Sequence, residues 1–293
     1  FFKQKTAYES MPSLVGSEMC IRDRVWSISG LEVTVDRLLS APGDAWNVFR
    51  RMAPPAVSEA IDRGVPGKVL ESVHIAWIGT MIGAVISLPL AFLAAGNVSP
   101  AWIRTPVRQL FNVIRAVPEL ILAVILIPIT GLGSWAGALA IGIHSVGTLG
   151  KWATEAIEGV DPGPLEAVEA TGGRWASTMR WGVLPQVLPV VTSQWLFRFE
   201  INVRASTVLG MIGAGGVGSE LVSQLVFRNF AAVGAVLIMT IAVVMAIDTA
   251  SAAVRQRIIR GGTRTGGPAV DDEDRKYPME TQGELMVTEP LWF

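Results

Sequence analysis

Five apolar stretches recur along the chain, each about as long as a helix that crosses a membrane. They lie at residues 69–95, 107–130, 135–157, 187–209 and 230–254. A spanning helix needs about 20 mostly apolar residues, because the hydrocarbon core is about 30 Å thick and every backbone polar group inside it must be paired. Glycines and small residues occur throughout these stretches, as expected where membrane helices pack closely. The pattern predicts an all-α, polytopic membrane bundle with about five spanning helices in residues 69–257.

A polar segment at residues 158–185 separates the third apolar stretch from the fourth. Asp161, followed by Pro162 and Pro164, suits a helix start, where a missing amide donor costs nothing and an acid favours the positive helix end. The pair Gly172 and Gly173 suits a helix end, because glycine adopts the left-handed conformation that terminates helices. The pattern predicts a short exposed helix, although composition alone fits an ordinary solvated connector equally well.

Three flanking segments differ from the apolar stretches. Residues 25–68 contain repeated proline and glycine pairs and are too polar to span, so we expect an external segment with an interfacial helix at residues 44–52. Residues 258–293 lack apolar content and are expected to form a disordered cytoplasmic tail. Residues 1–24 have no initiator methionine, apolar core or cleavage site and resemble translated sequencing adapter. We exclude this string from fold reasoning, the alternative being a genuine disordered N-terminus.

Composition supports a membrane protein. Of 293 residues, 51% are hydrophobic and 17% charged, against about a quarter charged in soluble proteins, and the mean hydropathy is +0.45. The formal net charge of −1 argues against nucleic-acid binding, which normally needs a basic surface. The single cysteine, Cys20, forms no internal disulfide and excludes a Cys-x-x-Cys metal site. We expect no bound metal and no catalytic residues, since no Ser/His/Asp or His-Glu-x-x-His arrangement is present.

The fourth apolar stretch carries three charges, Arg198, Glu200 and Arg204. Charges inside a membrane are costly and are therefore functional candidates. Glu200 and Arg204 are four residues apart on one helical face and can pair, and because one acid cannot neutralise two arginines, at least one guanidinium should face another helix's acid, such as Glu119, or the aqueous path. One interpretation is an ion pair that pins helices together. The other is a guanidinium that lines a substrate path and offers a planar donor fork to an oxyanion.

Arg115, Glu119 and His144 raise the same question in the second and third apolar stretches. All three are candidates for the substrate path. For His144 an interhelical hydrogen bond is the favoured alternative, because polar side chains often bridge membrane helices.

A glycine-rich run, residues 213–218, matches the pattern Gly-x-Gly-x-x-Gly. A dinucleotide site would need an acid about 20 residues later and a surrounding βαβ unit, and neither is present. We expect an irregular external turn made by Gly213, Gly215, Gly216 and Gly218. The chain also lacks a phosphate-binding Gly-x-x-x-x-Gly-Lys-Ser/Thr loop, so any ATP hydrolysis must come from a partner.

The polar segment resembles the signature loop of permease subunits of ATP-binding-cassette (ABC) importers. Val168 and Gly182 depart from that pattern, and the residues in register are Glu166, Ala167, Gly172, Leu184 and Pro185. Over residues 41–259 the chain is most similar to the permeases of phosphonate importers. The motifs that carry this resemblance lie at residues 115–120, 143–151, 155–158, 198–204 and 208–218.

The resemblance implies the transmembrane domain of a type I ABC importer, with one N-terminal helix missing from this chain. It implies a multi-pass permease of the bacterial cytoplasmic membrane that binds no cofactor itself. The implied partners are a pair of ATPase subunits that hold ATP and Mg, a periplasmic or lipid-anchored binding protein, and a second permease copy or a similar subunit. The loop at residues 166–172 would couple to the ATPase. Basic residues in short loops place that loop in the cytoplasm. Alternatives are import of another solute, such as methionine, phosphate or phosphite, and, from a different class, a membrane enzyme.

Overall fold

The structure is a computed structural model that describes residues 35–262. Within that range it contains helices and turns and no strand. The elements in chain order are α2 (Val35–Met52), α3 (Val57–Asp62), α4 (Val65–Ala94), α5 (Ala101–Ala116), α6 (Glu119–Thr130), α7 (Ser134–Glu158), α8 (Pro162–Ala170), α9 (Trp175–Ser177), the π-helical turn η1 (Thr178–Val183), α10 (Leu184–Met211), α11 (Val217–Val226) and α12 (Phe230–Gly262).

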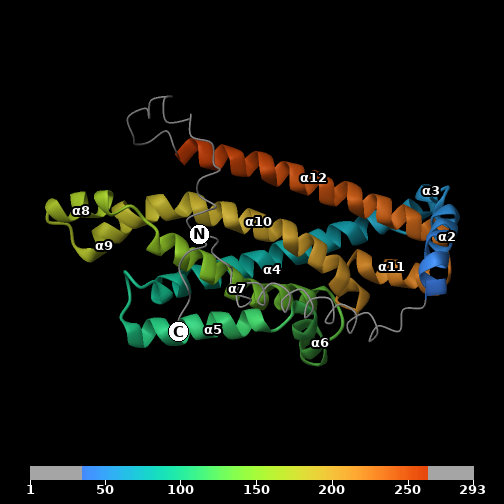
Figure 1. The fold of residues 1–293 in the computed structure, drawn as a ribbon, viewed down its shortest axis with the longest axis horizontal. Helices are drawn as coiled ribbons and strands as arrows, with labels where there is room; N and C mark the ends of the chain where they lie inside the picture. The colour runs from blue at the N-terminus through green and yellow to red at the C-terminus, as the bar shows by residue number, and fades with distance from the viewer. Residues whose placement is uncertain (1–34, 263–293) are drawn as a thin grey trace, which may run out of the picture.

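The long helices run side by side along the length of the molecule (Figure 1). One end carries α8 and α9, and the opposite end carries α2, α3 and α11. We call these the α8 end and the α11 end. Helix α7 lies in the interior of the bundle, where it contacts α4, α5, α6 and α10. The predicted all-α bundle is confirmed.

Small residues allow α4 and α7 to pack closely. A Cβ atom on Gly79 would lie 2.7 Å from Cγ2 of Ile141, and one on Gly83 would lie 2.5 Å from Cβ of Ser145. Real side-chain contacts are longer than this, so only glycine fits at either position. Because membrane helices gain nothing from burying apolar surface against one another, close backbone approach supplies much of their attraction. The Gly79-x-x-x-Gly83 spacing thus sets the α4–α7 contact.

The five predicted apolar stretches correspond to α4, to α5 with α6, and to α7, α10 and α12. Two of the described helices, α4 and α12, are long and apolar enough to cross a membrane alone, and a third span results if α5 and α6 count as one. Helices α7 and α10 have 25 and 28 residues but fall short in apolar content. Their polar residues are compatible with a membrane because many of them face other helices.

The second apolar stretch, predicted as one continuous span, is broken instead. Helix α5 ends at Ala116, α6 begins at Glu119, and their axes differ by 89°. Pro118 has no amide hydrogen, and a proline disfavours the helical conformation of the residue before it. Val117 accordingly adopts the extended values φ −91° and ψ 119°. This break puts a helix start in the middle of the apolar run.

The predicted interfacial helix at residues 44–52 is part of the longer helix α2, on which Trp46 and Phe49 are exposed. Its contact with lipid headgroups stays a prediction. Helix α12 continues to Gly262, past residue 258 where the disordered tail was predicted to begin. The rest of that tail and the adapter-like residues 1–24 lie outside the described residues.

Candidate functional site

Arg198 on α10 is buried in the centre of the bundle, with a relative exposure of 6%. Its Nη2 lies 2.7 Å from Nδ1 of His144, and its Nε donates to Oγ of Ser145 at 3.2 Å. A guanidinium only donates, so Nδ1 of His144 must accept, which places the ring proton on Nε2. Glu119, the first residue of α6, brings its Oε2 to 3.3 Å from the same Nδ1. Nδ1 of His144 therefore lies between the donor Arg198 and the acceptor Glu119. A proton on Nδ1 would replace the hydrogen bond from Arg198 by one to Glu119.

Two further polar contacts hold this cluster between helices. Asn202, one turn after Arg198, donates from Nδ2 to Oγ1 of Thr80 at 2.8 Å and to Oγ of Ser145 at 3.1 Å. These bonds join α10 to α4 and α7. Buried polar groups need such partners, since an unpaired one costs about 1–3 kcal/mol. The cluster is thus positioned by three helices.

Arg115 adds a second guanidinium to this region. Its side chain passes close to α7, where a Cβ on Gly147 would lie 2.9 Å from Cγ of Arg115. Gly147 is one turn beyond His144. Helix α6 also begins in this region, at Glu119, and no side chain caps the amide groups of its first turn. The start of a helix carries a partial positive charge. Two arginines and a helix start thus occur in this region with one acid, so the region favours an anion.

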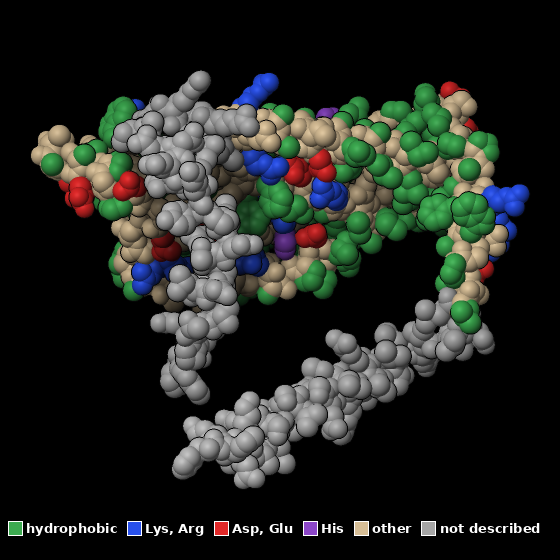
Figure 2. Space-filling view, turned by 45° about the horizontal axis from the view of Figure 1, so that its top comes forward, with side chains coloured by type: hydrophobic (Ala, Val, Ile, Leu, Met, Phe, Trp, Pro, Cys, Tyr) green, Lys and Arg blue, Asp and Glu red, His purple; other side chains and the backbone are tan. Residues whose placement is uncertain are grey.

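We call Arg115, Glu119, His144 and Arg198 the central cluster; the structure brings together these four predicted candidates, which come from four helices. Figure 2 shows basic, acidic and histidine side chains gathered midway along one face, with mainly apolar and uncharged surface around them. A charged group at mid-length of a membrane bundle is a functional candidate with named partners.

Glu200 and Arg204 do not join this cluster, and they do not form the pair with each other that their spacing allows. Arg255 reaches Oε1 of Glu200 at 3.3 Å, and Arg204 bonds Asp248. An α-helix turns about 100° per residue, so Glu200 and Arg204 share the face toward α12, while Arg198 lies on the other side of α10. This face holds α10 against α12, which matches the interpretation of ion pairs that pin helices together.

Sequence reasoning missed the partners of these charges. Ser145, Asn202 and Thr80 gave no signal, because small polar residues are frequent in membrane helices. Asp248 offered one, since it is an acid inside an otherwise apolar stretch.

The second site is the exposed helix α8. Asp161 caps it by accepting from the Gly163 amide at 3.0 Å, and Gly172 beyond its end has φ +80°, as predicted. Glu166 and Ala167 are exposed, whereas Leu165 and Val168 are half-buried, and Leu165 packs against the cluster around Val183 and Val187. Leu184 and Pro185 form the first turn of α10. The helix is therefore presented at the α8 end of the molecule with a polar outer face.

Two contacts fix α8 to the start of α10. Gln186 bonds both backbone groups of Asp161. Its Oε1 accepts a hydrogen bond from the Asp161 amide at 2.9 Å, and its Nε2 donates to the Asp161 carbonyl at 3.2 Å. A Cβ on Gly182 would lie 3.2 Å from Cγ and Cδ1 of Leu165. Gly182 departs from the signature pattern, and this close approach of α8 to η1 gives a physical reason for glycine there.

Gly172→Val is expected to misplace α8 and, if α8 is the ATPase-coupling loop that the sequence resemblance implies, to weaken binding of an ATPase subunit. No heavy atom lies within 4 Å of the new Cβ, so the effect comes from the backbone, where a β-branched residue at positive φ costs about 1–3 kcal/mol. Co-purification with the ATPase and substrate-stimulated ATP hydrolysis would measure it. Gly67→Val is the control, because Gly67 also has open space but no positive φ. If the Gly172→Val variant still co-purifies with the ATPase and still supports substrate-stimulated ATP hydrolysis, α8 is not the docking element.

The glycine-rich run forms the predicted turn at the α11 end, with positive φ at Gly213, Gly215 and Gly216. The Val217 amide donates to Oγ of Ser72 at 2.9 Å. Gly218 lies in the first turn of α11, which begins at Val217, rather than in the glycine-rich turn. The external location of this turn stays a prediction.

Comparison with known proteins agrees with this geometry. Residues 87–260 match the family described as binding-protein-dependent transport system inner membrane component. The chain belongs to this family. This inner membrane component shares its fold with the MetNI methionine ABC transporter in inward-facing conformations, at a TM-score of 0.60 and 22% identity, over 66% of this chain and 95% of that one.

Two relatives are more similar to this chain in sequence than the methionine transporter is. The phosphate-import permease protein PhnE of Mycolicibacterium smegmatis is 42% identical over 72% of this chain and 40% of its own length. The phosphite transport system permease protein PtxC of Stutzerimonas stutzeri is 41% identical over 64% of this chain and 69% of its own length. The chain therefore spans less than half of the mycobacterial relative.

Proposed function

We propose that this inner membrane component is the permease subunit of an ATP-driven importer of a phosphorus oxyanion: phosphonate, phosphite or phosphate. The observation that carries the proposal is Arg198, a buried guanidinium in the centre of the bundle whose partner His144 is neutral in this arrangement. Arg198 shares the central cluster with Arg115, and Glu119 is the acid of that cluster. An anionic solute would supply the missing countercharge during its passage.

The ligand class follows from the donors. Guanidinium groups bind phosphorus oxyanions through charge-assisted, often bidentate hydrogen bonds. The relatives at 41–42% identity are named for phosphate and phosphite, which supports this class over methionine. The structure named for methionine is only 22% identical and supports the fold alone.

The partners follow from the chain's family and from α8. A binding protein would deliver the solute at the α11 end, and two ATPase subunits would grip α8 in this chain and in a second permease copy or a similar subunit. ATP and Mg would be held by those ATPases. The chain would then lie in the bacterial cytoplasmic membrane as a multi-pass protein, with α8 on the cytoplasmic side. Solute movement would become vectorial because each ligand binds the inward and outward states with different affinity.

Reconstituted uptake tests this function. Proteoliposomes containing the chain, its ATPase and its binding protein are expected to accumulate phosphonate, phosphite or phosphate when ATP is supplied, and not methionine. Vesicles without the ATPase are the control and should accumulate none. Uptake of methionine instead would overturn the ligand class. Turnover of a lipid or peptide by the chain alone would instead favour a membrane enzyme.

A further inference from the structure

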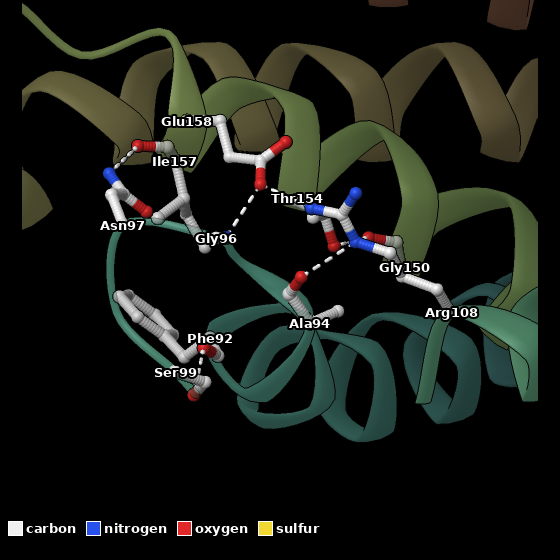
Figure 3. Close-up of polar contacts among 10 residues, drawn as sticks. All are labelled: Phe92, Ala94, Gly96, Asn97, Ser99, Arg108, Gly150, Thr154, Ile157 and Glu158. Carbon is white, nitrogen blue, oxygen red and sulfur yellow. Dashed lines mark hydrogen bonds and ion pairs between the residues drawn. The ribbon is translucent and has the colours of Figure 1, made fainter. Parts of the chain in front are cut away.

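Glu158, the last residue of α7, joins three parts of the chain at the α8 end (Figure 3). Its Oε1 accepts from the Gly96 amide at 2.6 Å and from the guanidinium of Arg108 on α5. Arg108 also donates from Nε to the carbonyl of Ala94, the last residue of α4, at 2.9 Å. One carboxylate thus ties the end of α7 to the α4–α5 connection and to α5 itself.

A second bond reinforces this tie. Asn97 donates from Nδ2 to the carbonyl of Ile157 at 2.8 Å. The connection also fits closely around the carboxylate, since a Cβ on Gly96 would lie 2.9 Å from Oε1 of Glu158. The end of α7 and the α4–α5 connection are therefore held in one relative position.

The position of Glu158 along the chain matters because α8 begins four residues later, at Pro162. A displacement of α8 reaches the end of α7 through this short stretch of chain, and it reaches η1 and α10 through the contacts of Leu165 and Gln186. Arg108 then passes it to α5, and Arg115 lies seven residues further along that helix. Seven residues are about two helical turns, or roughly 10 Å, and bring both arginines to the same face. Beyond Arg115, α5 ends at the break before Glu119.

We infer that the Glu158–Arg108 pair, called here the α5 link, transmits the movement of α8 along α5 to Arg115 and Glu119 in the central cluster. This inference rests on the proposed function, because it assumes that an ATPase moves α8. Helix α5 is continuous from Ala101 to Ala116 and serves as a rigid rod between the two sites. Glu158 and Arg108 are positioning residues in this account and do not touch the solute.

The exposure of the link separates this role from a contribution to stability. The side chains of Arg108 and Glu158 are 42% and 35% exposed, and ion pairs at such positions add little to stability. The packing of α5 on α7 depends instead on Phe111, which is buried at 2% exposure. Loss of the link should therefore leave the bundle folded and change the coupling between ATP hydrolysis and transport.

A neighbouring pair provides a matched control. Lys151 and Glu155 lie 3.7 Å apart, are similarly exposed, and border the same groove between α5 and α7. Both belong to α7, one turn apart, so their ion pair joins no two elements. Lys151→Gln removes a charge from the same surface without cutting the α5 link.

The first experiment measures solute molecules transported per ATP hydrolysed in the complete reconstituted complex. Arg108→Gln and Glu158→Ala are each expected to lower this ratio about five- to tenfold, within the range typical of coupling between sites. The double variant should lose less than the product of the two single losses, because both single variants remove the Arg108–Glu158 contact, although each also removes one other bond. Lys151→Gln should keep the parent's ratio.

Unchanged ratios in both single variants would overturn the inference, as would a double variant whose loss is the product of the two single losses. If Arg108→Gln fails to assemble, Arg108→Lys replaces it. Lysine keeps the charge but lacks the fork that bonds Glu158 and the Ala94 carbonyl together. An intermediate ratio is then expected, and the parent's ratio would contradict the link.

A second experiment does not depend on the identity of the solute. A fluorophore attached to the thiol of a Val113→Cys variant, in a Cys20→Ser background, reports on α5 between Arg108 and Arg115, because Val113 is exposed. ATP should shift its emission in the parent and in Lys151→Gln, and not in Glu158→Ala. An equal shift in Glu158→Ala would overturn the link. A shift in the parent without transport of any phosphorus oxyanion would instead refute the proposed solute and leave the link standing.

Discussion

Arg198→Gln is expected to reduce uptake of the phosphorus oxyanion about a hundredfold while the chain still inserts and folds. The guanidinium is the most deeply buried basic group of the central cluster, and a hydrogen bond between a charged group and its ligand, here the passing anion, contributes about 1.5–3 kcal/mol. Glutamine is neutral and still donates hydrogen bonds toward His144 and Ser145, so the bundle is left without a buried unpaired charge. Initial uptake rates in proteoliposomes, normalised to inserted protein, would measure the loss.

Arg204→Gln is the matched control on the same helix. Asp248 differs from Glu158 because its Oδ1 is buried without a hydrogen-bond partner. Loss of the guanidinium that bonds Oδ2 therefore leaves a partly buried carboxylate with no partner, and the expected defect is in folding or insertion. The double variant Arg204→Gln with Asp248→Asn should recover folding, because no lone carboxylate then remains in the α10–α12 contact. No such rescue is expected for Arg198→Gln. Transport at the parent's rate in both arginine variants would show that the charges of α10 are structural.

Gly218→Val is expected to destroy the folded α11 end of the molecule. A Cβ at this position would lie 2.0 Å from the carbonyl oxygen of Thr207 and 2.7 Å from the backbone nitrogen of Met211. Backbone atoms cannot rotate away as a flexible side chain does, so the overlap forces α10 and α11 apart. We expect a loss of about 3 kcal/mol or more, which lowers the melting temperature by roughly 10 °C in a domain of this size.

Gly67→Ala serves as the control for this prediction. Gly67 lies in the first turn of α4 with no heavy atom within 4 Å of an added Cβ. Alanine is the better helix former by about 1 kcal/mol at an interior position, so the control should melt at or above the parent's temperature. Thermal unfolding in detergent would compare the two variants. A Gly218→Val protein that melts with the parent would contradict the close packing of the glycine-rich run.

The sequence alone determined where the long apolar helices lie and which short helix stands exposed between two of them, but it did not predict α3 or α11. Apolar stretches of spanning length predict membrane helices because lipid offers no hydrogen bonds to an open backbone. The start and end of α8 were also predictable, since Asp161 and Gly172 act locally, through a cap and a left-handed residue. The residue types of the central cluster were visible for the same reason, as charges in apolar runs stand out without any knowledge of the fold.

Only the tertiary structure decided which partners the charged side chains have. The sequence spacing allowed Glu200 to pair with Arg204, but both reach α12, because the facing helix offers Asp248 and Arg255. The helix break at Pro118 was hidden by its apolar surroundings, and its 89° bend depends on how α5 and α6 each pack on α7. The link between Glu158 and Arg108 crosses 50 residues of sequence. Contacts at such separation depend on which helices become neighbours, and that is settled by close packing at positions such as Gly79 and Gly83 across the whole bundle.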